Sequence, residues 1–335
     1  MNMVLHENED AIIEREDTIS EPQFKDNGKL KEFDFAVSNP PFSTKAWSSG
    51  IKPENDEYKR FDGFDIPPKK NGDYAFLLHL IKSLKPTGKG AIILPHGVLF
   101  RGNVEAVIRK NLINRGYIKG IIGLPSNLFY GTGIPACIIF IDKEHAEGRK
   151  GIFLIDASKG FVKDGNKNRL QAKDIHKIVD VFTNQIEIPK FSRMVPVSEI
   201  SDDKNEYNLN IPRYIDSQEE EDIQDIEAHL KGDIPKKDID DLNQYWEVYP
   251  NIRQTLFAPS KRKNYESLIV DNSEIKTIIF EHDEFKKYSE KINKTYSEWK
   301  KINLSVLIKI KVGTNPKKLI SEISESVLDK FSKVK

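Results

Sequence analysis

The sequence predicts an α/β fold with a mostly parallel sheet, followed by a mostly helical C-terminal region. Over the first 160 residues, short β-rich runs alternate with longer helical patterns, which is typical of strand–helix–strand units. The runs Phe35–Val37 and Ala91–Leu94 are continuously apolar, as expected for strands covered by helices on both faces. With 335 residues, of which 38% are hydrophobic and 31% charged, the chain is long enough for two compact domains.

Six strands and two helices are expected in the first part of the chain. One helix, Tyr74–Leu84, follows the start signal Asn71-Gly72-Asp73, and the other is Val104–Asn114; apolar residues recur at helical spacing in both. The predicted strands are Ala11–Arg15, Phe33–Ser38, Gly90–Leu94, Ile118–Gly123, Ala136–Ile141 and Gly151–Ile155.

Residues 44–73 show no usable periodicity and contain several glycines and prolines. A loop of about thirty residues inside a compact domain is uncommon and is usually functional or disordered. Because it directly follows the proline-rich segment Asn39–Phe42, we expect a mobile loop that faces the substrate.

Beyond residue 160 the α/β pattern stops. Residues 161–250 form a mixed extension with a short helix at Lys173–Asn184, and residues 251–335 form a helical tail. The clearest helix, Ile275–Ile310, carries one apolar stripe that must be buried against its own domain or against a partner subunit.

The chain has 52 basic and 52 acidic side chains and therefore no net charge. A protein that binds DNA alone usually presents a basic face, so a partner would supply part of any such binding. The charges are segregated, because residues 216–241 are acidic and residues 300–335 are rich in lysine. Such runs are most often solvated helix faces.

Cys137 is the only cysteine, so no internal disulfide can form and we expect a reducing compartment, the cytoplasm. The sequence contains no apolar run long enough to cross a membrane and no positively charged leader. His79 and His96 have no second ligand at metal-site spacing, so we predict structural histidines and no metal site. Cys137 is expected in the core of a strand.

Asn39-Pro40-Pro41-Phe42 follows the predicted strand Phe33–Ser38, whose apolar run indicates burial. Neither proline can donate a backbone hydrogen bond and both fix φ, so the segment forms a stiff turn just beyond the strand. In open α/β sheets, ligands bind outside this end of the strands. The turn presents one side-chain amide, backbone carbonyls without strand partners and one aromatic ring.

These groups suit an exocyclic amine on a flat heterocycle, which has two N–H donors and a π face. The Asn39 side-chain oxygen and the Pro40 carbonyl can each accept one N–H, while Phe42 stacks on the ring. Attack of the held amine on an electrophile with a full positive charge then needs no strong general base. An amine inside the DNA stack reaches such a pocket only if its base flips out. The alternative is a proline-rich turn without a function.

Several blocks together resemble the modification (M) subunit of type I restriction–modification systems. The resemblance covers most of residues 1–250, in the blocks Asp17-Thr18, Phe33–Phe42, Asp73–Phe76, Leu94–Gly102, Gly123–Pro135 and Tyr207–Tyr214. It implies a Rossmann-like S-adenosylmethionine-dependent methyltransferase sheet that methylates adenine N6 in double-stranded DNA. It also implies a complex of two M subunits with one specificity (S) subunit, which restriction subunits can join.

The resemblance assigns the base-binding residues. Asn39, Pro40 and Phe42 would hold the target amine as catalytic residues, and Phe129 would pack with Phe42 against the flipped base. A buried phenylalanine next to Leu128 is, however, equally consistent with ordinary core packing. The DNA recognition sequence would reside in the S subunit.

On the cofactor side, the resemblance implies that Asp17 lies beside the adenine of S-adenosylmethionine, together with Thr18 and Asn39. The family's Asp-Pro-x-x-Gly-Ser-Gly loop and its ribose-binding acidic residue do not occur in the sequence. Met1–His6 resembles the helix that follows both, so residues 1–160 would be the C-terminal part of the catalytic domain. We therefore expect the chain alone to bind the cofactor poorly and to be inactive.

The family sheet has the strand order 3-2-1-4-5-7-6, and the present strands match strands 3 to 7. The resemblance therefore implies an incomplete sheet from which the first two strands are missing. Ala11–Arg15 would then lack a neighbour, and one edge of Phe33–Ser38 would be unpaired.

Two other functions remain open from the sequence. One is a non-catalytic truncated subunit that acts as an interaction module through its C-terminal helices. The other is a protein-glutamine methyltransferase, a class that usually carries tyrosine in place of Phe42. The glycine pattern Gly131–Ala136 leads into a strand rather than a helix, so it does not predict a dinucleotide-binding loop.

Overall fold

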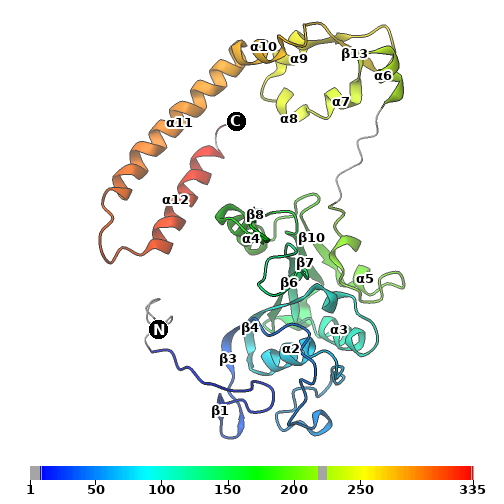
Figure 1. The fold of residues 1–335 in the computed structure, drawn as a ribbon, viewed down its shortest axis with the longest axis vertical. Coiled ribbons are helices and arrows are strands. Elements are labelled where there is room, and N and C mark those ends of the chain that lie inside the picture. Colours follow the sequence, from blue (N-terminus) through cyan, green and yellow to red (C-terminus); the bar gives the residue numbers. More distant parts are fainter. Residues whose placement is uncertain (1–7, 9, 218–224, 333, 335) are drawn as a thin grey trace. The chain divides into compact units, whose positions relative to one another are not determined.

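The computed structural model describes residues 8, 10–217, 225–332 and 334. The chain divides into two compact units, Met1–Glu219 and Glu220–Lys335, so the boundary lies inside the predicted mixed extension. The first unit is built on a sheet and the second mainly on helices (Figure 1). The helix expected at Met1–His6 and residues 218–224 of the acidic run lie outside the described residues.

The first unit contains a six-stranded sheet in the order β10-β7-β5-β6-β4-β3. Its strands are β3 (Phe33–Ser38), β4 (Leu84–Pro95), β5 (Ile118–Gly123), β6 (Ala136–Asp142), β7 (Gly151–Asp156) and β10 (Ser192–Pro196). The pairs β3–β4 and β5–β7 are parallel and the other pairs are antiparallel. The prediction of a mostly parallel sheet was therefore wrong, because β6 follows β5 without a crossover helix and must run in the opposite direction.

Four strands nevertheless share one direction, namely β3, β4, β5 and β7. Their carboxyl ends consequently lie at the same edge of the sheet. The order β3-β4-β6-β5 corresponds to the order 4-5-7-6 of the family sheet, which confirms that part of the expected topology.

Helices cover the two faces of the sheet unequally. The predicted helices are confirmed as α2 (Asp73–Lys82), α3 (Val104–Asn114) and α4 (Ala172–Asn184). The first two pack on one face, through a core that includes Leu78, Ile108 and Ile121. On the other face, α4 packs against β5 and β7. The shorter elements are β1 (Lys25–Asp26), β2 (Lys29–Leu30), η2 (His96–Leu99), η3 (Ala146–Gly148), β8 (Val162–Asp164), β9 (Lys167–Arg169), α5 (Val197–Ile200) and η4 (Ile211–Arg213).

β3 is the last strand of the sheet and has one neighbour among the described residues, as expected. Phe35 and Val37 are 76% and 85% exposed, so one face of β3 is uncovered there. The predicted strand Ala11–Arg15 was wrong: this segment forms no regular structure, and Ile12 and Ile13 are exposed. Without a neighbouring strand, the backbone N–H and C=O groups of an extended segment bond to water. No strand pairing then stabilises the extended conformation.

Residues 44–73 contain only one short 3₁₀ turn, η1 (Pro53–Asn55), so the expected lack of regular structure is confirmed. Trp47 and Phe61 are nevertheless buried, and their rings meet edge to face with centroids 5.5 Å apart. Nε1 of Trp47 also donates to the Pro68 carbonyl at 2.9 Å. These contacts anchor both halves of the segment and argue against movement of the segment as a whole.

A buried ion pair holds the middle of this segment. Arg60 Nη2 lies 2.6 Å from Asp56 Oδ1, and both side chains are almost fully buried. Arg60 Nη1 donates to the Ile19 carbonyl at 2.8 Å and to Nδ1 of His79 on α2 at 3.3 Å. Because a guanidinium can only donate, Nδ1 of His79 must be unprotonated. Burial, reinforced by the charge of Arg60, lowers the pKa of His79 to about 4.

The second unit begins with short helices and a small antiparallel sheet of order β11-β13-β12, which the sequence did not predict. Its elements are α6 (Ile226–Lys231), β11 (Ile234–Pro235), α7 (Lys236–Asp240), α8 (Asn243–Trp246), α9 (Pro250–Leu256), β12 (Phe257–Pro259), β13 (Tyr265–Leu268), α10 (Ile275–Glu281), α11 (Asp283–Leu307) and α12 (Pro316–Phe331). None of the described helices combines the length and the apolar character that a membrane span requires.

The helix expected over Ile275–Ile310 is split into α10 and α11 at His282. His282 is extended, and its Nδ1 accepts the Glu284 N–H at 3.2 Å, so it caps α11. α11 and α12 form a helical hairpin in which Trp299 Nε1 donates to Ser326 Oγ at 2.9 Å.

We predict that the free energy of unfolding falls as the pH is lowered from 7 to 4. The unfolded chain takes up a proton on His79 near pH 6.5, whereas the folded chain does so only near pH 4. The stability lost across this window is on the order of 3 kcal/mol, at about 1.4 kcal/mol per pKa unit.

Urea unfolding at several pH values measures this loss. His79→Gln should remove most of the difference, because glutamine can accept the Arg60 hydrogen bond but does not titrate. His145→Asn, at an exposed histidine with left-handed backbone that asparagine tolerates, should retain it. An unchanged pH dependence in His79→Gln would refute this account.

Candidate functional site

Three segments converge at the edge of the sheet where the carboxyl ends of β3, β4 and β5 lie. They are Asn39–Phe42 after β3, His96–Gly102 after β4 and Leu124–Pro135 between β5 and β6. The common direction of the three strands is what brings these segments together, although they are far apart in the sequence.

The Asn39–Phe42 turn combines a fixed backbone with an available side chain. The β3 ladder ends with Ser38 opposite Ile92, and Pro40 is buried directly beyond it. Asn39 is exposed, and its side-chain amide has no hydrogen-bond partner among the described residues. An amide that no other protein group uses, held by a buried proline, is suited to binding a ligand.

The structure brings the two predicted base-packing rings together. Phe42 and Phe129 lie with ring centroids 5.7 Å apart and an interplanar angle of 75°. Phe129 also packs against the core cluster beneath α4, so it contacts both the core and the turn. The role of Phe129 at a base stays a prediction, but its position beside Phe42 satisfies the geometric requirement for that role.

A small hairpin, β8–β9, holds the loop that carries Phe129, and the sequence analysis missed it. Lys167 Nζ donates to the carbonyls of Phe129 (2.7 Å) and Thr132 (3.0 Å). Asn168 Nδ2 donates to the Ser126 carbonyl at 2.7 Å. The two-residue loop Gly165-Asn166 between β8 and β9 is a hairpin signal that could have revealed the turn.

A second missed feature is a group of charged side chains behind the Asn39–Phe42 turn. Asp73 Oδ1 accepts a hydrogen bond from the Ser43 N–H at 2.7 Å, and Asp73 Oδ2 accepts one from Nη1 of Arg101 at 2.9 Å. The same Nη1 lies 3.3 Å from Oε1 of Glu105, whose pKa is raised by burial. The sequence analysis placed Asp73 in a helix start signal and in a block of the family resemblance, without a role at the site.

On the predicted cofactor side, Asp17 uses its carboxylate locally. Its Oδ1 accepts the N–H groups of Ile19 and Ser20, both at 3.0 Å. These hydrogen bonds, that of Ser20 first, lower the pKa of Asp17. A cofactor role for Asp17 stays a prediction, and only the carboxylate oxygen outside this turn is available for it.

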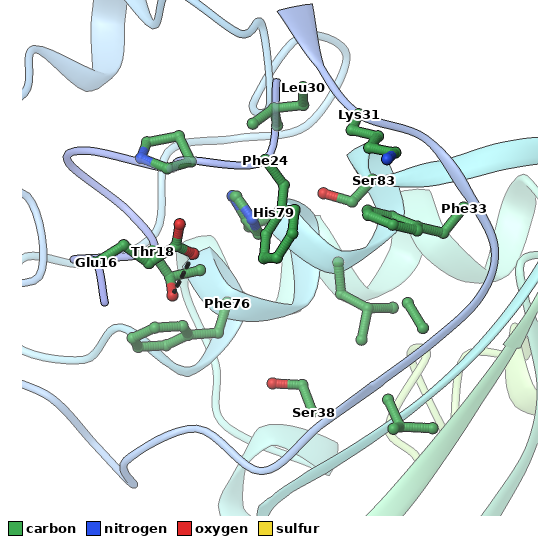
Figure 2. A pocket seen from close by; sticks show the side chains of 14 residues that line it. Glu16, Thr18, Phe24, Leu30, Lys31, Phe33, Ser38, Phe76, His79 and Ser83 are labelled. Atoms are coloured by element: carbon green, nitrogen blue, oxygen red, sulfur yellow. Dashed lines mark hydrogen bonds between the residues drawn. The ribbon is translucent and has the colours of Figure 1, made fainter. Parts of the chain in front are cut away.

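A cavity of about 190 Å³ lies between β3, α2 and residues 16–31. Thr18 lines it together with Ser38 from the end of β3, and Phe24, Phe33 and Phe76 supply aromatic walls (Figure 2). Thr18 Oγ1 donates to Glu16 Oε1 at 3.3 Å. The predicted cofactor residue Thr18 is thus brought close to the strand that leads into Asn39.

The cavity beside β3 is too small to enclose the whole of S-adenosylmethionine. The cavity is smaller than the roughly 300–1,000 Å³ of most ligand pockets. Beyond β3, where the resemblance places the cofactor loop, the described sheet has no further strand.

His96 and Cys137 lie outside the Asn39–Phe42 turn. His96 begins η2, burial lowers its pKa, and its Nε2 is buried without a hydrogen-bond partner in the described structure. Cys137 is fully buried in β6, which raises the pKa of its thiol and confirms the prediction of a strand-core residue. The described part of the chain holds no cluster of three metal-ligating side chains.

The mixed α/β sheet carries an Asn-Pro-Pro-aromatic turn at its carboxyl edge, and the amide of Asn39 in this turn has no partner among the described residues. In comparison with known proteins, residues 1–223 match the family described as N-6 DNA methylase. The chain belongs to the N-6 DNA methylase family.

The relatives of this chain are methylase subunits of type I restriction enzymes. That of MjaVII from Methanocaldococcus jannaschii is 34% identical over 257 residues, which cover 73% of this chain and 43% of the relative. That of MpnII from Mycoplasma pneumoniae is 32% identical over 262 residues, which cover 76% of this chain and 48% of the relative. This chain therefore spans less than half the length of either relative.

One similar solved structure is the type I restriction-modification system methyltransferase subunit from Streptococcus thermophilus. It superposes with a TM-score of 0.58 at 38% identity and covers 65% of this chain and 45% of that chain. The resemblance inferred from the sequence motifs is thereby confirmed.

We predict that the 335-residue chain binds S-adenosylmethionine weakly or not at all, because the cavity beside β3 is smaller than most ligand pockets. Isothermal titration calorimetry measures this directly. Tight binding by the isolated chain would contradict the account of the cavity beside β3.

Proposed function

We propose that this chain forms the adenine-binding part of an adenine-N6 DNA methyltransferase, the M subunit of a type I restriction–modification complex. The observation that carries the proposal is the unpartnered Asn39 amide at the sheet edge, with the Phe42 and Phe129 rings beside it. Membership of the N-6 DNA methylase family and the names of the relatives support the same activity.

The turn would hold the target amine through its two hydrogens. The Asn39 side-chain oxygen accepts one N–H of the adenine N6 amine, and the Pro40 carbonyl accepts the other. Accepting both hydrogens draws the nitrogen out of conjugation with the ring and directs its lone pair toward the methyl donor. Because Pro40 is buried and fixed in φ, the two acceptors keep their spacing, and catalysis is largely positioning.

The two phenylalanines would hold the ring of the flipped adenine. Their near-perpendicular rings form a corner, so a base that stacks on Phe42 meets Phe129 at its edge. Lys167 and Asn168 keep the Phe129 loop in place through four of its carbonyls. A base taken out of the DNA stack gains stacking and hydrogen bonds here in exchange for those it loses.

S-adenosylmethionine is the proposed cofactor and supplies a methyl group on a positively charged sulfur. Of this chain, Thr18, Asp17 and Asn39 would face that group, and the exposed face of β3 marks the side from which it approaches. No strong base is required, because the amine would release its proton to water only after the methyl transfer, while Asn39 and Pro40 hold it in place.

Double-stranded DNA, an S subunit and a second M subunit are the proposed partners, and restriction subunits can join them. The second unit supports subunit assembly, because its helical hairpin leaves large apolar side chains exposed. These include Tyr296, Ile302, Leu304, Leu307, Ile320 and Leu328. Exposed apolar patches of this kind are typical of protein–protein contacts.

We predict that Asn39→Ala lowers the methylation rate of the active enzyme by at least about 100-fold, as expected when one acceptor in a preorganised site is lost. Cofactor binding should stay largely intact, because Asp17 and Thr18 would still face the cofactor. Transfer of labelled methyl groups to DNA measures the rate.

Asn114→Ala is the matched control, since Asn114 is an exposed asparagine at the end of α3. It should methylate DNA at the wild-type rate. Methylation retained in Asn39→Ala would refute the assigned role of the amide.

A further inference from the structure

The backbone directly after the Asn39–Phe42 turn is strained. Ser43 has a φ of 50°, in the left-handed region that side chains other than glycine rarely adopt. Such a conformation persists only where surrounding contacts hold it. Two hydrogen bonds do so here: Ser43 N–H donates to Asp73 Oδ1, and Thr44 accepts the Gly72 N–H through its carbonyl at 3.0 Å.

Asp73 is fully buried, yet each of its carboxylate oxygens has a partner. One oxygen accepts from Ser43 and the other from Arg101, which lies on the segment after β4. A buried carboxylate without such partners would be strongly unfavourable, so the group is stable only while both contacts exist. The carboxylate therefore links the strand-end segments of β3 and β4.

Arg101 reaches Asp73 from the surface, and Gly97 makes room for it. The Arg101 side chain is 29% exposed, and its Nη1 is shared between Asp73 and Glu105. A Cβ on Gly97 would lie 2.7 Å from Nε and 2.8 Å from Nη2 of Arg101. A side chain at this position would force the guanidinium to shift beside the carboxylate without removing either charge.

We propose that Asp73, held by Arg101, is a positioning residue that sets the conformation of the Asn39–Phe42 turn. It acts through the Ser43 N–H and touches neither the base nor the cofactor. The inference rests on the proposed function for its catalytic consequence, whereas its structural consequence is independent of that function.

The first test is structural and uses the 335-residue chain with 4-fluorophenylalanine at position 42. The ¹⁹F resonance reports the ring contact between Phe42 and Phe129. Asp73→Asn removes the charge that pairs with Arg101, and Gly97→Ala displaces Arg101 while the carboxylate stays intact. Both variants should shift or broaden the resonance.

Two control variants match these changes. Asp34→Asn removes a carboxylate from the exposed ion pair with Lys85, and Gly102→Ala adds a Cβ that meets no atom within 4 Å. Both should leave the resonance unchanged. If Asp73→Asn does not fold, Gly97→Ala decides the test alone. An unshifted resonance in a folded Gly97→Ala or Asp73→Asn variant would overturn the proposal.

The second test measures methylation by the active enzyme. Asp73→Asn and Gly97→Ala should lower kcat about tenfold or more and change KM for DNA less, since a misplacement of about 1 Å can cost 10²-fold in rate. A wild-type kcat in these variants would overturn the positioning role. Absence of adenine methylation in the wild-type enzyme would instead overturn the proposed function and leave the spectroscopic result standing.

Discussion

The shared direction of β3, β4, β5 and β7 is the constraint on which the rest of the site depends. Because these strands run the same way, the segments that follow β3, β4 and β5 end at one edge of the sheet. Phe42, Phe129 and Arg101 come from these three segments, and the rings of Phe42 and Phe129 are in contact. The buried carboxylate of Asp73 then joins two of the segments, and the β8–β9 hairpin fixes the third.

The exposed face of β3 and the cavity next to it lie beside this edge of the sheet. Phe35 and Val37 are exposed, and the cavity lined by Thr18 and Ser38 opens next to them. Under the proposed function, the groups that would hold the amine lie together at this edge, whereas the cavity beside β3 is smaller than most ligand pockets.

Much of the fold could be predicted from local patterns. α2, α3 and the strands of the sheet follow from hydrophobic periodicity, and the Asn39–Phe42 turn follows from two prolines after a strand. The direction of β6 could not be predicted in this way. The sequence of a loop such as Leu124–Pro135 does not show whether the strand that follows runs parallel or antiparallel to the strand before it. Ala11–Arg15 has the composition of a strand, but composition cannot supply the neighbour that a strand needs.

The site was predicted where chemistry is concentrated in one segment and missed where it depends on contacts across the fold. Asn39 and Phe42 are adjacent in sequence, and the unusual proline pair marks them. Asp73 and Lys167 act through backbone groups of distant segments, so no local pattern distinguishes them from a helix cap or a surface lysine. The ring contact between Phe42 and Phe129 came from the family resemblance rather than from spacing.

The central claim is that the Asn39 amide accepts a hydrogen of the target amine. The most direct measurement compares the affinity of the active enzyme for DNA with adenine and with purine, which lacks the N6 amine, at the target position. Purine flips out more easily than adenine for either enzyme, so the preference for adenine over purine should be larger in the wild type than in Asn39→Ala by about 1 kcal/mol or more. An equal preference for adenine in Asn39→Ala would show that the amide does not hold the amine.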